Sequence, residues 1–327
     1  MTDKATIQSL IGGMERAFPS IRADSRAEDI RKRYDDVGTQ VITQDIEPVG
    51  AVHDRSIRGA DGDIAVRIYQ PHGAGDTPLP VVLFYHGGGF VLCGLDSHDA
   101  VCRATCNASG CIVVAVDYRL APEYPFPSGV EDCYAALQWV ADHAFEVGGD
   151  ADRIAVVGDS AGGNLAAAVA LLARDRSGPR LCHQVLVYPM LDPRADTPSH
   201  REVGPGFYLL SEEVQWFWAQ YLTKDDWQNP YASPTSAADL TGLPPALVVT
   251  AENDPLRDEG ERYAAALSAA RVDVTLHRYD DMFHSFMSFL AELEEARDLM
   301  AEIAGALGDA FGHESESSGR SEKGIGP

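Results

Sequence analysis

Six apolar runs, each bounded by turn residues, constrain this chain more than any other feature of its sequence. They are Pro80–Tyr85, Cys111–Val116, Arg153–Val157, Gln184–Tyr188, Ala246–Thr250 and Val272–Tyr279. Runs that are apolar on both faces suit strands that helices cover on both sides. Segments with helical spacing alternate with them: Asp99–Ser109, Val130–Phe145, Ala161–Asp175, Arg257–Ala270 and Ser288–Leu307. This alternation predicts an α/β fold, in which a mostly parallel sheet lies between two helix layers.

Three regions depart from the alternation. The first, Thr6–Tyr34, has helical spacing that Pro19 interrupts, which predicts two short helices. The second is a strand pair, Val52–Arg58 and Ile64–Gln70, joined by a glycine-flanked turn that is typical of a hairpin. The third, Leu191–Leu240, is rich in proline and aromatic residues and is interpreted as an inserted helical element.

The charge balance restricts the class of partner. Of 327 residues, 26 are Lys or Arg and 50 are Asp or Glu, so the net charge is −24. Such a surface repels nucleic acid and anionic membranes, and neither is expected as a partner. The acidic excess is typical of salt-adapted proteins, although a GC-rich genome is an alternative explanation.

The distribution of apolar residues bears on the location of the protein. No run approaches the roughly 20 apolar residues that a membrane helix needs. Residues 1–33 carry charges throughout and lack the apolar core of a signal peptide. We therefore expect a cytoplasmic protein without integral membrane association.

The cysteines give no sign of a metal site. They lie at positions 93, 102, 106, 111, 133 and 182, without any C-x-x-C pair and without a histidine at metal-ligand spacing. Several have apolar neighbours, so we expect buried free thiols and no metal. A disulfide between some pair is left open.

The pentapeptide Gly158-Asp159-Ser160-Ala161-Gly162 fits the pattern G-x-S-x-G. An apolar strand precedes it and an Ala-rich helix follows, which is the context in which a nucleophilic serine projects from a sharp turn. Such a turn strains the serine backbone, and the flanking glycines remove collisions between side chains. The helix N-terminus favours negative charge near the Ser160 oxygen. A phosphate-binding turn is the alternative, but no G-x-x-x-x-G-K pattern follows.

A second glycine-rich turn, residues 86–90 with the sequence His-Gly-Gly-Gly-Phe, follows the first apolar run. Consecutive glycines leave backbone N–H groups unshielded, and such donors stabilise the oxyanion formed from an acyl carbonyl. We assign as donors the N–H groups of Gly88, Gly89 and Ala161. Gly87 in place of Gly89 is a close competitor. His86 is interpreted as an anchor for this loop and not as a base, because it sits at the strand end beside the glycines.

A serine hydroxyl is a weak nucleophile and needs a histidine, whose tautomer a carboxylate must fix. In folds with this elbow, the acid and then the histidine follow the serine along the chain. His284 is assigned as the base, because it follows the run Val272–Tyr279 and a short loop, residues 280–283, where a catalytic loop belongs. His183 and His277 belong instead to strand patterns.

The acid is expected after the preceding strand, Ala246–Thr250. Glu252, Asp254 and Asp258 are the candidates there. Glu252 sits too close to the strand end, and Asp258 has the position of a residue at a helix N-terminus. Asp254, which Pro255 follows, is therefore assigned as the acid.

With these residues in place, the chain resembles the hormone-sensitive-lipase family of α/β-hydrolases, a group of microbial carboxylesterases. Beyond the two glycine-rich turns, the matching segments are Asp117–Glu123, Tyr188-Pro189, Tyr231–Pro234 and Asp254–Gly260. The resemblance covers roughly residues 45–305. Relatives usually carry glycine at the position of Ser285. We interpret Asp117–Glu123 as scaffold, in which Arg119 and Glu123 form charged hydrogen bonds that hold the glycine loop.

The resemblance implies an α/β-hydrolase fold with an eight-stranded core sheet, helices on both faces and a small helical cap. It also implies the triad Ser160, Asp254 and His284, no cofactor, and frequent homodimers through the last strand and helix. The expected segments are cap helices at 1–45, catalytic core at 46–190 and 241–311, a cap insertion at 191–240, and a disordered Gly/Ser/Glu/Lys-rich tail at 312–327.

The expected reaction is hydrolysis of short- to medium-chain carboxylic esters through an acyl-enzyme on Ser160. The expected partner is therefore a small-molecule ester, and the acyl-chain length rests on analogy with the family's small cap. An amidase or peptidase on the same fold is one alternative, although the chain leaves no room for the propeller domain of some such peptidases. A non-catalytic ligand receptor is another, but such proteins lose the base, whereas His284 is present.

Overall fold

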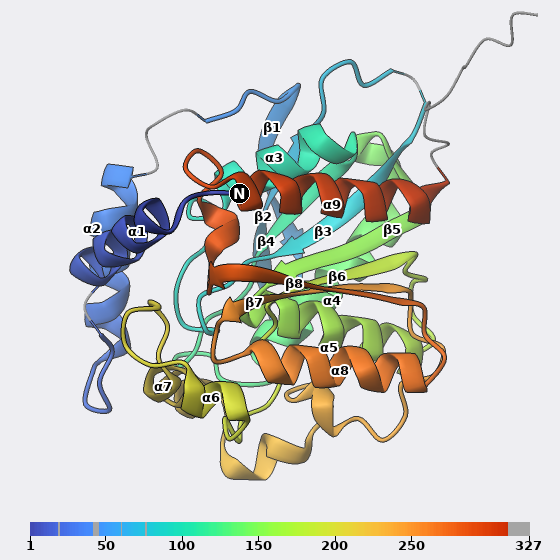
Figure 1. Cartoon of the computed structure of the whole chain (residues 1–327). Helices are drawn as coiled ribbons and strands as arrows, with labels where there is room; N and C mark the ends of the chain where they lie inside the picture. Colours follow the sequence, from blue (N-terminus) through green and yellow to red (C-terminus); the bar gives the residue numbers. More distant parts are fainter. Residues whose placement is uncertain (19, 42–45, 60, 76, 313–327) are drawn as a thin grey trace, which may run out of the picture.

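The structure is a computed structural model that describes residues 1–18, 20–41, 46–59, 61–75 and 77–312, and a sheet of eight strands lies at its centre (Figure 1). The strand order is β1-β2-β4-β3-β5-β6-β7-β8. The strands are β1 (Ala51–Arg58), β2 (Asp63–Gln70), β3 (Leu79–Tyr85), β4 (Ile112–Asp117), β5 (Gly149–Asp159), β6 (His183–Val187), β7 (Ala246–Asn253) and β8 (Val274–Phe283). β2 is antiparallel to β1 and β4, and all other neighbours are parallel, which confirms the expected sheet.

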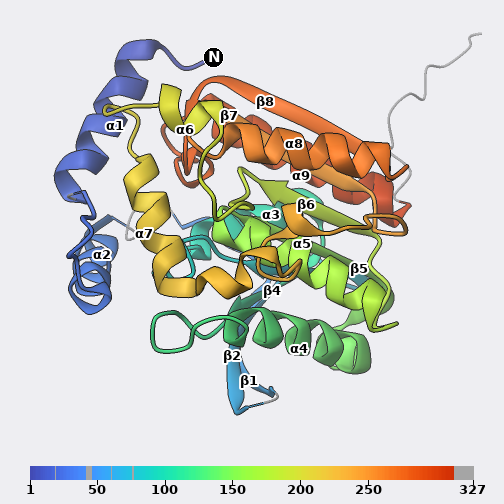
Figure 2. The same cartoon turned by 90° about the horizontal axis from the view of Figure 1, so that it is seen from below.

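Helices cover both faces of this sheet (Figures 1 and 2). On one face lie α3 (Asp99–Ser109) and α9 (Glu294–Phe311), and on the other lie α4 (Ser128–His143), α5 (Ala161–Asp175) and α8 (Arg257–Ala269). Alternate side chains of a strand point to opposite faces. In β3, Val81 and Leu83 accordingly belong to one hydrophobic cluster, and Val82 and Phe84 belong to the other. Five of the six apolar runs are therefore buried on both faces, as predicted, whereas residues 273–278 of the sixth run, in the outer strand β8, are mostly exposed.

The segments outside the sheet are helical, as predicted. The N-terminal pair is α1 (Lys4–Ala17) and α2 (Ala27–Val41), and the insertion contains α6 (Pro198–Glu202) and α7 (Ser211–Tyr221). Short 3₁₀ helices are η1 (Ala144–Val147), η2 (Lys224–Gln228), η3 (Pro234–Ser236) and η4 (Phe286–Ser288). Both views place α1, α2 and α7 at the same end of the molecule (Figures 1 and 2).

Hydrogen bonds join the N-terminal helices to the insertion. The Ile21 N–H donates to Glu213 Oε1 over 2.8 Å, and the Tyr34 and Tyr208 hydroxyls are 3.1 Å apart. These contacts link segments that are far apart in the sequence. The division of the chain into cap and core stays a prediction, and the expected tail lies outside the described residues except for Gly312.

The predicted loop at residues 280–283 is wrong, because β8 continues to Phe283. After an irregularity near Ala251, the pairing with β7 resumes at Asn253 and Phe283. The two acidic residues in this stretch, Asp280 and Asp281, are exposed at the edge of the sheet. Backbone pairing therefore extends the strand through residues whose polarity had indicated a loop, and His284 follows the strand directly.

The predicted start of the last helix is also wrong. α9 begins at Glu294 rather than Ser288, and η4 occupies part of the preceding stretch. Glu294 and Glu295 stand in the first turn, where negative side chains stabilise a helix N-terminus. The apolar residues before them, Phe286 and Met287, are buried and do not continue the helix. The prediction had placed the start of one long helix at Ser288.

β8 is the outer strand at one edge of the sheet. Its side chain Leu276 is 45% exposed, which is unusual for a large apolar residue in this chain. Pairing of two copies through this edge stays a prediction. No helix among the described residues is both long and apolar enough to cross a bilayer.

None of the six cysteines, all of which lie in the described part of the chain, forms a disulfide. Cys102, Cys106, Cys111 and Cys133 are buried free thiols, and Cys93 and Cys182 are half-buried. The expectation of buried free thiols is confirmed for the four in the core.

Candidate active site

Ser160 lies at the sharp turn between β5 and α5, as the G-x-S-x-G pattern predicted. Its backbone has φ 55° and ψ −119°, a conformation that is strained for a residue with a side chain. A Cβ on Gly158 would lie 2.2 Å from Gly162 O, and a Cβ on Gly162 would lie 1.9 Å from Tyr85 O. Only glycine fits at these two positions, so the surrounding backbone holds the serine in its strained geometry.

The structure brings Ser160, His284 and Asp254 together, each at the carboxyl end of a different parallel strand. His284 Nε2 is 3.0 Å from Ser160 Oγ, and His284 Nδ1 is 2.7 Å from Asp254 Oδ2. All three side chains are buried. With Nδ1–H donating to the carboxylate, Nε2 is left to accept the serine proton, which is the arrangement that base catalysis requires.

The other candidate acids have different partners. Glu252 accepts the Asp281 N–H over 2.7 Å, and Asp258 accepts the Ser199 N–H over 2.9 Å. Asp254 Oδ1 instead accepts the Leu256 N–H over 2.8 Å, which fixes the carboxylate as it faces His284.

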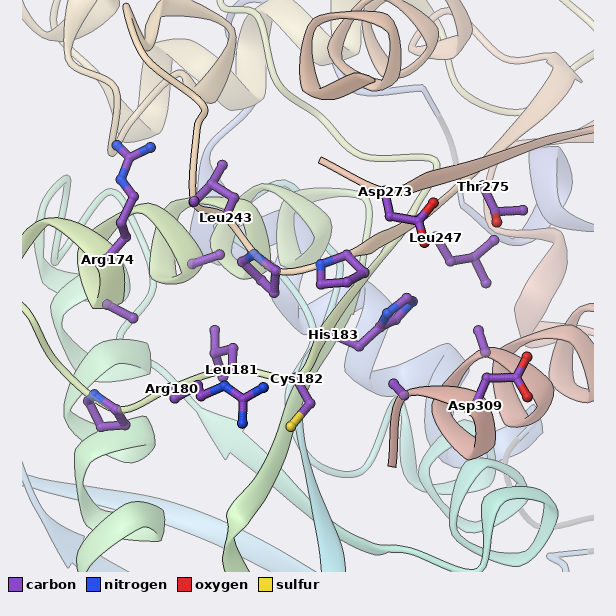
Figure 3. A pocket seen from close by; sticks show the side chains of 18 of the residues that line it. Arg174, Arg180, Leu181, Cys182, His183, Leu243, Leu247, Asp273, Thr275 and Asp309 are labelled. Carbon is purple, nitrogen blue, oxygen red and sulfur yellow. The ribbon is translucent and has the colours of Figure 1, made fainter. Parts of the chain in front are cut away.

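His183 lies at the opposite end of the sheet. It lines a separate pocket of about 930 Å³. Figure 3 shows it there among Leu247, Asp273 and Asp309. The pocket is lined by the amino ends of β6, β7 and β8, whereas the triad follows carboxyl ends. Burial lowers the pKa of His183 to about 4, so the ring is neutral at physiological pH. Because of this location, His183 cannot act as the base for Ser160.

In the glycine-rich loop, hydrogen bonds to the Gly87 and Gly88 carbonyls fix two peptide groups. This sets the direction of the Gly88 and Gly89 N–H groups, which belong to the same two peptides. His86 Nδ1 lies 2.7 Å from Gly87 O and must donate to it, because a carbonyl only accepts. Burial lowers the pKa of His86 to about 3, which keeps the ring neutral. In a trans peptide the N–H points opposite to the C=O. The Gly88 N–H therefore points away from His86, which supports the interpretation of His86 as an anchor.

The next peptide is held by a turn. The Val91 and Leu92 N–H groups donate to Gly88 O over 3.0 and 2.9 Å, so the Gly89 N–H points the other way. Gly88 and Gly89 have φ values of 106° and 60°, which favour glycine. Ala161 is the first residue of α5, so its N–H has no carbonyl partner within the helix.

Gly87, the competing donor, is already engaged. Its N–H donates to Asp159 Oδ1 over 3.0 Å, and the same oxygen is 3.2 Å from His98 Nε2. Burial, the largest single influence, would raise the pKa of Asp159, but the combined attraction of His98, His284 and His86 lowers that pKa below its ordinary value. Asp159 thus ties the nucleophile turn to the glycine loop and removes Gly87 from the set of free donors.

Two further residues frame the base. The Tyr188 ring packs beside the His284 ring, with centroids 4.8 Å apart. Ser285 adopts φ 69°, a left-handed conformation that favours glycine, which explains why glycine suits this position. The Tyr188 ring thus restricts the movement of the imidazole.

The scaffold interpretation of residues 117–123 is half wrong. Arg119 pairs with Asp132, over 2.8 Å from both Nε and Nη2, and does not touch the glycine loop. Glu123 binds Arg31 of α2, and Arg31 in turn binds Val91 O over 2.6 Å. Glu123 therefore reaches the loop only through a residue of the N-terminal helix.

A cavity of about 2010 Å³ opens above Ser160 and His284. Its walls are mostly apolar, and the N-terminal helices and the insertion contribute part of them, for example Met14, Phe18, Val214 and Phe217. A Cβ on Gly89 would lie 2.2 Å from the Phe217 ring, so α7 packs directly on the donor loop. Among the described residues no group of three or more His, Cys, Asp or Glu side chains could hold a metal ion.

Sequence reasoning missed three residues of this site: Arg31, Asp159 and Tyr188. Asp159 offered a signal, because a carboxylate between an apolar strand and an apolar helix must be buried and paired. Arg31 offered none, since its partners are 60 to 92 residues away in the chain.

Comparisons with known proteins agree with this geometry. A family model of the alpha/beta hydrolase fold matches residues 82–288. The carboxylic ester hydrolase LipN of Mycobacterium tuberculosis is 48% identical over 72% of this chain, and the match spans 64% of that longer protein.

Two further relatives match over most of their length. The carboxylesterase NlhH of Mycobacterium tuberculosis is 45% identical over 78% of this chain and 82% of its own. Among solved structures, a hyperthermophilic esterase from the archaeon Pyrobaculum calidifontis superposes with a TM-score of 0.89 and 42% identity, covering 94% of this chain and 99% of that one.

Proposed function

We propose a mechanism from the premise that this chain belongs to the alpha/beta hydrolase family, in its hormone-sensitive-lipase-like group, and is a carboxylesterase. Ser160 is the nucleophile, His284 the general base and Asp254 the residue that orients it. The observation that supports these roles is the continuous path from Asp254 Oδ2 through His284 to Ser160 Oγ. Every catalytic group in this mechanism is a side chain or a backbone N–H group of the chain.

In the first half-reaction, His284 Nε2 takes the Ser160 proton while Oγ attacks the ester carbonyl. The carbonyl oxygen becomes an oxyanion, which the Gly88, Gly89 and Ala161 N–H groups stabilise. His284 then gives its proton to the leaving alcohol. In the second half-reaction, a water molecule repeats the sequence on the acyl-enzyme and releases the acid.

The cavity supports small esters with an apolar acyl group as substrates. α1, α2 and α7 together act as a cap whose apolar side chains contact the acyl chain. Phe217 packs against the donor loop and restricts the space closest to the reacting carbonyl. We therefore propose a preference for short to medium acyl chains.

Removal of the nucleophile tests the catalytic assignment. Ser160→Ala should lower kcat for p-nitrophenyl butyrate by at least about 10⁴, because serine, histidine and oriented acid act as a unit. Ser268→Ala, at an exposed position of α8, is the matched control and should keep wild-type activity. Organophosphate labelling of the wild-type protein, followed by peptide mass analysis, should place the adduct on Ser160. Turnover retained in the Ser160→Ala protein refutes the assignment.

A substrate series tests the proposed specificity. Rates on p-nitrophenyl esters with acyl chains of two to sixteen carbons should be highest for the shorter chains and low for the longest. The amide that matches the best ester should be cleaved far more slowly. An amide turned over as fast as its ester would instead favour an amidase.

A further inference from the structure

Arg31 lies on α2, yet its guanidinium binds the backbone beside the glycine-rich loop. Nε donates to Val91 O over 2.6 Å, and Nη2 donates to Ala121 O over 2.5 Å. The Glu123 carboxylate accepts from Nη1 over 2.8 Å and from Nη2 over 2.6 Å. This pattern uses the planar, forked shape of the guanidinium, which a lysine ammonium cannot reproduce. The contact is thus a specific one.

The two backbone partners of Arg31 belong to the structure that orients an oxyanion donor. Val91 is part of the turn whose N–H groups hold Gly88 O, and this turn directs the Gly89 N–H away from that carbonyl. Ala121 donates its own N–H to Phe90 O over 2.9 Å. Arg31 therefore joins the glycine-rich loop, at Val91, to the segment that contains Ala121, and the two segments also bind each other directly.

The helix that presents Arg31 also borders the substrate cavity. Tyr34, one helical turn further along α2, lines the cavity, and Phe18 stacks on it with ring centroids 4.3 Å apart. One short helix thus contacts the substrate space through Tyr34 and the donor loop through Arg31. A shift of α2 must displace both.

We propose that Arg31 is a positioning residue, which from α2 fixes the orientation of the Gly89 N–H. The oxyanion is then fully stabilised only when α2 is packed against the core as it is in this structure. The inference rests on the proposed function, because it takes Gly89 as a donor to the oxyanion. A substrate that fills the cavity and contacts Tyr34 stabilises the packed position of α2. Through Arg31, it thereby also stabilises the productive orientation of the Gly89 N–H. Substrate binding and transition-state stabilisation are coupled in this way.

The proposal predicts an effect on turnover and not only on binding. Arg31→Ala should lower kcat about tenfold for both p-nitrophenyl acetate and p-nitrophenyl hexanoate, less than the roughly 10²–10³ lost with a whole donor. The KM for the acetate should change less than about twofold, because a two-carbon acyl group offers the cap little contact. Arg33→Ala, at an exposed position of the same helix, is the matched control and should resemble wild type.

A conservative variant distinguishes whether Arg31 orients the Gly89 N–H or only attaches the cap to the core. Arg31→Lys keeps the charge that attracts Glu123 but loses the fork, so it should show the same fall in kcat as Arg31→Ala. If either folded variant keeps wild-type kcat with both esters and only raises the KM for the hexanoate, Arg31 is a tether for the cap and the proposal is overturned. If Arg31→Ala does not fold, the Arg31→Lys result decides alone.

Failure of the proposed function would look different. A wild-type protein that hydrolyses neither ester, or that resists organophosphate labelling, contradicts the catalytic assignment whatever the Arg31 variants do. Wild-type turnover with unaltered kcat in both Arg31 variants contradicts only the positioning role.

Discussion

Three of the non-glycine residues with a positive φ lie beside the proposed reacting atoms. Ser160, Tyr188 and Ser285 have φ values of 55°, 35° and 69°. Each non-glycine residue in such a conformation costs about 1–3 kcal/mol, which packing elsewhere must offset. The three residues are the proposed nucleophile, the ring beside the proposed base and the residue that follows this base. The strain therefore marks the positions at which the fold imposes geometry on the site.

A second residue-scale feature is the buried carboxyl of Glu259 on α8. Oε1 accepts the Leu191 N–H over 2.6 Å, whereas Oε2 is 3.6 Å from His200 Nε2, beyond hydrogen-bond distance. Burial is the main reason that the pKa of Glu259 is raised to about 7. His200 and the Leu191 N–H lower this pKa, and Asp192 raises it. The folded protein thus binds this proton more tightly than the unfolded chain does.

The sign of the resulting pH dependence follows from linkage. Because the folded pKa lies above the unfolded value of 4.5, stability from this group is complete below pH 4.5 and is lost as pH rises through about 7. Glu259→Gln, which cannot ionise, should raise the free energy of unfolding at pH 8 by about 2 kcal/mol and have little effect at pH 5. Urea denaturation at both pH values measures this.

The matched control is Glu292→Gln, at an exposed position. It should leave the free energy of unfolding unchanged at both pH values. A Glu259→Gln protein that is less stable than wild type at pH 8 would show that the charged carboxyl is favourable where it lies, contrary to the burial argument.

At the scale of elements, close approach between backbones decides which residues are permitted. α5 comes so close to the end of β3 that a Cβ on Gly162 would lie 1.9 Å from Tyr85 O. Strand backbone cannot move aside as a flexible side chain can. By contrast, a Cβ on Gly305 of α9 would meet nothing within 4 Å.

Alanine substitutions at these two glycines should have opposite effects. Gly162→Ala should destabilise the protein by at least about 3 kcal/mol or prevent folding, because the overlap is with backbone. Gly305→Ala should stabilise it by about 1 kcal/mol, since alanine is the better residue inside a helix. Thermal denaturation of both variants beside wild type is the measurement. Equal stabilities in the two variants would contradict the close approach of α5 to β3.

At the scale of the whole molecule, the net charge of −24 acts on every conformation of the chain. Exposed like charges repel more strongly in the compact state, and at 0.1 M salt screening already acts beyond about 10 Å. Raising NaCl from 10 mM to 1 M at pH 8 should therefore raise Tm by about 5 °C. Near pH 4.6, the pI of the sequence, the same addition should have little effect. A Tm that falls with salt at pH 8 would argue against salt adaptation.

Parallel strands are what bring the triad together at this scale. Ser160, Asp254 and His284 follow β5, β7 and β8, whose carboxyl ends lie along one edge of the sheet. Their distance along the chain is large, but sheet order places the three turns near one another. This is why patterns read separately in three segments converge on one site.

Local patterns determined much of this protein before any folding was considered. The turn at Ser160 depends on neighbours within a few residues, and so do the glycine loop and the limits of α3 and α5, because strand, turn and helix preferences act over that range. Only the tertiary structure decided where β8 ends, that Asp159 engages Gly87, and that Arg31 reaches Val91. These features depend on the direction of side chains and on pairing between distant segments, which packing sets and no single stretch of sequence contains.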